Sequence, residues 1–114
     1  MSAEKKSLSA EEILAHDPVA LEDLQKLRHE LDQIDEHIIS MFARRFMITD
    51  LVGAFKTKHK LPAADAQREK DMKAKYSALA EEQGLDPDFV NSIFSSVLEE
   101  SVKNHKKIAE KNHG

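Results

Sequence analysis

Apolar side chains recur at spacings of three and four residues along the first half of the chain, a period typical of an amphipathic α-helix. The pattern consists of Leu24, Leu27, Leu31, Ile34, Ile38, Met41, Ile48, Val52 and Phe55, which we call the apolar face. Asp17-Pro18 precedes it in the order of an N-cap residue and a first-turn proline. Pro62 disfavours the α region for Leu61 and ends the element. We therefore predict one helix from Pro18 to about Lys60, roughly 60 Å long.

Two shorter helices are predicted after this long one. The first begins near Asp65, and Gly84 supplies its stop. Asp86-Pro87 repeats the cap-and-proline start for the second. The stripes that these helices would bury are Met72, Tyr76 and Leu79, then Val90, Phe94, Val97 and Leu98. Because the turn between them is short, we expect them to pack antiparallel. The pattern predicts an all-α fold, a three-helix subunit with a very long first helix.

The helical domain is expected to span residues 17–112, after a polar N-terminal extension of residues 1–16. Within the extension, Ser9 and Glu12 have the spacing of a capping box, which predicts a short helical turn. The extension lacks the continuous apolar core of a signal peptide, and no later run is long enough to span a bilayer. We therefore expect a cytoplasmic protein that does not bind membranes.

The length of the first helix predicts a homodimer. The two shorter helices should fold back on its C-terminal half, which leaves the N-terminal half of the apolar face uncovered. So much exposed apolar surface is uncommon on a monomer. A dimer whose long helices lie side by side would cover it. A simple coiled coil built on the same spacing is the structural alternative.

Composition limits the possible partners. The chain has 114 residues, of which 33% are charged and 5% aromatic, and its formal net charge is −4. This charge argues against a general nucleic-acid or anionic-membrane surface. Cysteine is absent, which excludes disulfides and thiolate chemistry. The six histidines show no metal-ligand spacing, and there is no glycine-rich phosphate loop. We therefore expect no metal and no cofactor.

Charged residues interrupt the apolar positions of the first helix. Arg45 stands where the spacing between Met41 and Ile48 requires an apolar residue. Lys56 lies eleven residues further along, which is three turns plus about 20°, so both side chains share one face. Two cations about 16 Å apart along the axis could hold a ligand that carries separated anionic groups.

The other two helices carry polar residues at comparable positions. They are Asp65, Arg68 and Glu69 on the second helix, and Ser101 and His105 on the third. Each has a simpler explanation, since Arg45 could pair internally with an acid, Asp65 could be only a cap, and His105 could be only a packing residue. Their coincidence on three inner faces favours a polar pocket, because unpaired buried charge is costly. Arg28 lies about 25 Å from Arg45 along the helix and could reach such a pocket only from a partner subunit.

In order and spacing, four segments resemble the all-helical (AroQ-type) chorismate mutases. They are LRHELDQIDEHIISMFARR, VGAFK, ADAQRE and FVNSIFSSVLEESV. The resemblance covers about residues 20–109 and implies an intertwined homodimer that converts chorismate to prephenate. It implies that Arg45, Arg68 and the partner subunit's Arg28 bind the substrate, together with Asp65 and Ser101. Lys56 would donate to the ether oxygen, and Glu69 would accept from the substrate hydroxyl.

His105 departs from the family pattern, which has glutamine or glutamate as the second donor to the ether oxygen. Imidazole can also donate, so we assign His105 this catalytic role and expect a pH-dependent rate. Two enzymatic alternatives use the same scaffold: an isochorismate pyruvate-lyase and an aminodeoxychorismate mutase. The third alternative is a non-catalytic helical dimer. The full set of Asp65, Arg68 and Glu69 favours the mutase.

Overall fold

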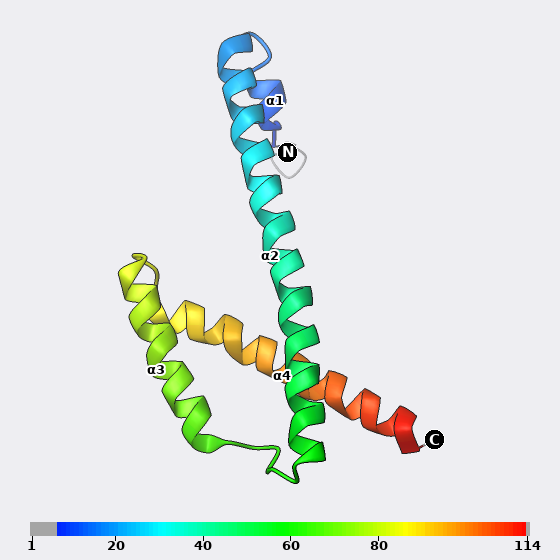
Figure 1. Cartoon of the computed structure of the whole chain (residues 1–114). Coiled ribbons are helices and arrows are strands. Elements are labelled where there is room, and N and C mark those ends of the chain that lie inside the picture. The colour runs from blue at the N-terminus through cyan, green and yellow to red at the C-terminus, as the bar shows by residue number, and fades with distance from the viewer. Residues whose placement is uncertain (1–6, 114) are drawn as a thin grey trace, which may run out of the picture. The chain divides into compact units, whose positions relative to one another are not determined.

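Helices make up nearly all of this computed structural model, which describes the backbone of residues 7–113 and the side chains of residues 7–107. The helices are α1 (Ala10–Ile13), α2 (Pro18–Lys58), α3 (Ala66–Glu82) and α4 (Pro87–His113), and no strand occurs within this range (Figure 1). The prediction of an all-α chain with a very long first main helix is confirmed, since α2 has 41 residues. The chain divides into two units at Ala43 and Arg44, within α2, and each unit is described separately below.

Local capping explains where the helices begin. Ser9 Oγ accepts a hydrogen bond from the Glu12 amide at 3.1 Å, as the capping-box spacing predicts. Asp17 Oδ1 accepts from the Ala20 amide at 3.2 Å, and Asp86 Oδ1 accepts from the Asp88 amide at 3.0 Å. Each carboxylate satisfies an amide that has no partner within its helix.

The C-terminal ends of α2 and α3 share one geometry. Gly84 after α3 has a φ of 72°, and the Leu85 amide donates to the Ala80 carbonyl at 2.8 Å. Lys60 after α2 has a φ of 56°, and the Leu61 amide donates to the Lys56 carbonyl at 2.8 Å. Both ends are Schellman motifs, in which the left-handed position favours glycine. Gly84 fits this position, whereas Lys60 occupies it at a steric cost.

Replacing Lys60 with glycine is expected to raise the free energy of unfolding by about 1 kcal/mol, because glycine adopts positive φ without a Cβ clash. Chemical denaturation at fixed protein concentration measures the change. Lys58→Gly is the matched control, and it should lower stability by about 1 kcal/mol because Lys58 is still helical. A Lys60→Gly variant no more stable than the original chain would show that the left-handed residue carries no strain.

The second unit, residues 44–114, contains the small core. Tyr76 of α3 stacks on Phe94 of α4 with ring centroids 4.0 Å apart, and Asn91 Nδ2 donates to Ser77 Oγ at 2.9 Å. These pairs run in opposite directions along the two helices, so α3 and α4 are antiparallel, as predicted. The most buried described side chains are those of Ala80, Val97 and Ser101.

Most residues of the apolar face of α2 are exposed in each of the two units. Ile48, Val52 and Phe55 are each about half exposed, although the sequence predicted that folded-back helices would cover this part. That prediction is wrong because α4 meets α2 on a neighbouring face, at Thr49, Asp50 and Gly53. The N-terminal positions Leu27, Leu31, Ile34 and Ile38 are also exposed, as expected.

Candidate active site

Arg45, at the start of the second unit, contacts an aromatic ring of α4. Its guanidinium carbon lies 5.6 Å from the centroid of the Phe94 ring, within the range of a cation–π interaction. Phe94 stacks in turn on Tyr76, so residues of α2, α4 and α3 meet at this point. Among the described side chains, Arg45 forms no ion pair with Asp65 or Glu69, which was the simpler explanation for an arginine at this position. The cation is therefore positioned by a ring and its charge is not neutralised there.

Ser101 and His105 of α4 face the same stretch of α2. Ser101 is only 5% exposed, and its Oγ lies 3.5 Å from Thr49 Oγ1. His105 is half-buried, with Nε2 3.1 Å from the Thr49 carbonyl oxygen and 3.4 Å from Asp50 Oδ1. Because the two α4 residues are four apart, both reach α2 within one helical turn.

Gly53 lets the imidazole approach the backbone of α2. A Cβ atom at this position would lie 3.2 Å from His105 Cε1 and 3.3 Å from Nε2, closer than most real contacts. Glycine inside a helix is unfavourable, and the close approach of His105 gives a packing reason for Gly53. An i, i+4 pair of Thr49 and Gly53 on one face was the available signal, but it could not be linked to His105 from sequence.

Lys56 lies one turn beyond Gly53 on α2. Its Nζ donates to the carbonyl oxygen of Ala63 at 3.3 Å, in the segment that connects α2 to α3. The side chain is half-buried, and Lys56 lies on the same helix as Arg45. A backbone carbonyl is a weak partner for an ammonium group, so this contact leaves Lys56 able to exchange it for an anionic ligand.

The three candidate residues of α3 lie at its N-terminal end. Asp65 is the N-cap, since its Oδ1 accepts from the Arg68 amide at 3.0 Å. Arg68 and Glu69 are exposed in the first turn. No described contact joins these three side chains to Arg45, Ser101 or His105. Asp65 therefore has a structural role in any case, and its second carboxylate oxygen is left for other partners.

Arg28 belongs to the first unit, residues 1–43. Its guanidinium forms an ion pair with the Glu11 carboxylate of α1, and both side chains are about half exposed. The polar extension therefore places an acid against the one candidate residue that the sequence assigned to a partner subunit. This contact could not be predicted from sequence, because the two residues lie in different predicted elements.

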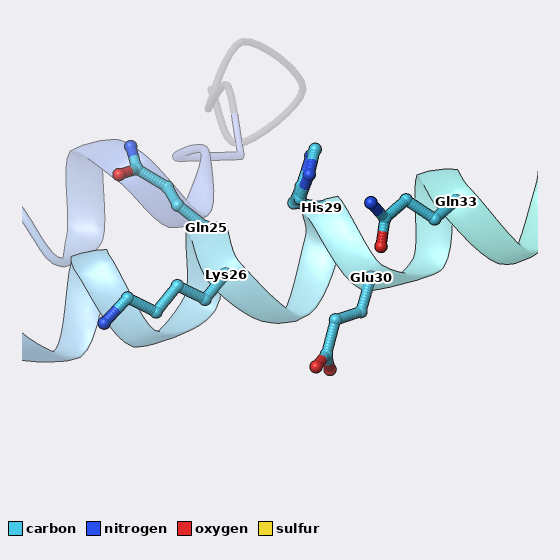
Figure 2. Close-up of a pocket in the computed structure, with 5 residues that line it drawn as sticks. All are labelled: Gln25, Lys26, His29, Glu30 and Gln33. Carbon is cyan, nitrogen blue, oxygen red and sulfur yellow. The ribbon is translucent and has the colours of Figure 1, made fainter.

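A surface depression elsewhere on the chain contains none of the candidate residues. It is an open depression on α2 lined by Gln25, Lys26, His29, Glu30 and Gln33 (Figure 2). The side chains in Figure 2 point in different directions from a single helix and do not converge on one point. A site for a small anion needs converging groups, so we assign no function to this depression. No group of three or more acids and histidines in the described residues could hold a metal ion.

The helical architecture and the cluster on α2 and α4 define an all-α protein with a polar inner face. The chain belongs to the family described as chorismate mutase type II, whose sequence model matches residues 27–106. The matched range begins one residue before Arg28 and ends one residue after His105, so it contains every candidate residue. No helix in the described part of the chain has the length and apolar character needed to cross a membrane.

Curated relatives agree with this family. A "bifunctional chorismate mutase/prephenate dehydratase" of Buchnera aphidicola subsp. Schizaphis graminum is 30% identical over 89 residues, covering 78% of this chain and 23% of the relative. A "T-protein" of Haemophilus influenzae is 31% identical over 87 residues, covering 76% and 23%. The corresponding bifunctional protein of Escherichia coli K12 is 28% identical over 79 residues, covering 69% and 20%. The matched part of this chain thus spans less than a quarter of each relative.

Proposed function

We propose that this chain is a chorismate mutase that rearranges chorismate to prephenate in phenylalanine and tyrosine biosynthesis, in the cytoplasm. The observation that carries the proposal is the packing of Ser101 and His105 against the stretch of α2 between Arg45 and Lys56. The hydrogen-bonding groups of α4 therefore lie against the part of α2 that carries the two cations. The family match and the names of the relatives, two of which include chorismate mutase, support the same activity.

The substrate is a dicarboxylate, and the charges of the proposed site suit it. Arg45 and the partner subunit's Arg28 would hold the two carboxylates, because guanidinium groups bind carboxylates through two parallel hydrogen bonds. Arg68, Asp65 and Ser101 would complete the binding contacts. Glu69 would accept a hydrogen bond from the substrate hydroxyl. Four cations and two acids leave a net positive site for a doubly negative ligand.

The proposed reaction requires no nucleophile and no cofactor. The ether C–O bond of chorismate breaks while a C–C bond forms between the two parts of the same molecule, so no group enters or leaves. The protein would accelerate the reaction by holding the folded, reactive conformer. It would also stabilise the negative charge that develops on the ether oxygen, with Lys56 and His105 as donors.

The active form is proposed to be an intertwined homodimer. The apolar face of α2 supports this assembly, because a row of exposed apolar side chains favours association. A partner helix on this face would also bring its own Arg28 toward the site of the first chain. For Arg28 to serve the partner, its ion pair with Glu11 must open. Glu11 therefore competes with a substrate carboxylate.

The presence of His105 favours the alternative enzymes, because the chorismate mutase family is expected to have glutamine or glutamate at this position as a donor to the ether oxygen. Purified chain should be incubated separately with chorismate, isochorismate and aminodeoxychorismate, and the products separated by chromatography. We expect prephenate from chorismate as the main product. Salicylate from isochorismate would instead identify a pyruvate-lyase, and a rearranged amino product would identify an aminodeoxychorismate mutase. No turnover of any substrate by a folded dimer would support the non-catalytic reading.

A further inference from the structure

Asp50 carries a buried carboxylate oxygen that lacks a hydrogen-bond partner. Its Oδ1 is inaccessible to solvent, and no described group donates to it. The nearest ring nitrogen is His105 Nε2 at 3.4 Å, within ion-pair distance. A buried carboxylate oxygen without a partner is costly, so the arrangement calls for a reason. The adjacent imidazole provides one.

Two oxygen atoms face the same nitrogen of the His105 ring. The Thr49 carbonyl oxygen lies 3.1 Å from Nε2, and Asp50 Oδ1 lies on that nitrogen at 3.4 Å. A carbonyl can only accept a hydrogen bond, and so can an ionised carboxylate. The hydrogen bond to the Thr49 carbonyl therefore requires the proton to be on Nε2, and the Asp50 carboxylate beside it favours the same placement through its charge. The hydrogen bond at Nε2 therefore determines the tautomer of the His105 ring, and with it the protonation of Nδ1.

A proton fixed on Nε2 determines what Nδ1 can do. In the neutral ring, Nδ1 then carries a lone pair and can only accept. The ether oxygen of the substrate also only accepts, so neutral His105 could not donate to it from Nδ1. The imidazolium form carries protons on both nitrogens and could donate.

We propose that Asp50 is a positioning residue that acts through His105, an inference that rests on the proposed function. The Thr49 carbonyl accepts the Nε2–H hydrogen bond, the Asp50 carboxylate holds the ring by its charge, and Nδ1 is left for the substrate. His105 then donates to the ether oxygen only as imidazolium, and Asp50 is the counter-ion of this form. Asp50 itself does not touch the substrate.

The groups around the ring are consistent with this pairing. On α4, the described neighbours one turn away are Ser101 and Val102, neither of which titrates between pH 5 and 8. On α2, Asp50 is the acid that faces the ring, and Gly53 lies beneath it. The next charged residue of α2 is Lys56, whose Nζ is directed to the Ala63 carbonyl. Among the described residues, Asp50 is therefore the acid that lies within ion-pair distance of the His105 ring.

Steady-state kinetics against pH test the kinetic part of the proposal. We expect kcat/KM for chorismate to fall as pH rises, because a neutral ring with its proton on Nε2 cannot donate from Nδ1. His105→Gln should give a flat profile, since an amide donates without titrating. Asp50→Asn, which keeps the shape of the side chain, should lower kcat/KM about tenfold at low pH. In the His105→Gln background the same change should cost less than about twofold, because no ring remains to be positioned.

Nitrogen-15 NMR of the histidine rings tests the tautomer without any substrate. His105→Gln identifies the resonances of His105 by their loss. We expect the neutral ring to carry its proton on Nε2, and Asp50→Asn to shift the ring away from this single tautomer. A proton on Nδ1, or an equal cost of Asp50→Asn in both backgrounds, would overturn the proposal. Absence of chorismate turnover would instead contradict the proposed function, while the NMR result still decides the role of Asp50.

Discussion

Replacing Lys56 with alanine is expected to lower kcat for chorismate by about 10²- to 10³-fold, the typical cost of removing one donor to a developing oxyanion. The ammonium group would interact most strongly with the ether oxygen as the C–O bond breaks, because negative charge grows there. An interaction that is stronger in the transition state than in bound substrate changes kcat more than KM. The effect should therefore be concentrated in kcat.

Lys58→Ala is the matched control for this prediction. Lys58 is an exposed lysine in the last turn of the same helix, but it lies off the face shared by Arg45 and Lys56. Its replacement should leave kcat within about twofold, as expected for a surface substitution. Far-UV circular dichroism should show unchanged helix content for both variants. Equal activity of Lys56→Ala and the original chain would remove Lys56 from the site.

Replacing Arg28 with alanine is expected to lower kcat/KM for chorismate about 100-fold, mainly through KM. The loss corresponds to a charge-assisted hydrogen bond to a substrate carboxylate, which is present before and during the reaction. Arg44→Ala is the matched control, because it also removes one arginine from α2 but at an exposed position off the apolar face. It should retain nearly full activity.

Glu11→Gln is a second control, and it separates binding by Arg28 from simple loss of its ion pair. Both Arg28→Ala and Glu11→Gln break the contact between α1 and α2. Glu11→Gln leaves the guanidinium free for substrate, so its KM should be unchanged or lower. A KM that rises equally in both variants would mean that the ion pair itself, and not binding of substrate by Arg28, supports activity.

The helix boundaries could be predicted because the signals that set them are local. Three caps lie within three residues of the amides that they satisfy: Asp17, Asp65 and Asp86. Gly84 is also a local signal, because glycine readily adopts the positive φ found there. Lys60 was not recognised as a left-handed residue, because lysine gives no such signal. The long helix was predicted from its apolar period, with Pro18 at its start and Pro62 after its end, and its great length is confirmed.

The contacts between helices could not be predicted in the same way. Asp50 and His105 are 55 positions apart, and hydrophobic period assigns a polar residue such as Asp50 to a solvent-exposed face. The face of α2 that meets α4 is marked by a glycine and hydrogen-bonding groups, not by the apolar residues that a pattern search favours. The polar pocket was inferred from residues that break the pattern. The contacts of His105 with Thr49 and Asp50 required the structure.

The central claim is that each active site combines Lys56 of one chain with Arg28 of the partner subunit, and a mixed dimer tests it most directly. Arg28→Ala and Lys56→Ala chains with different affinity tags should be co-expressed and the heterodimer isolated with both tags. In a two-fold symmetric dimer, one site then has both residues and the other has neither. We expect about one half of the original activity per dimer, although each parent variant is nearly inactive. A heterodimer no more active than its parents would contradict the shared site.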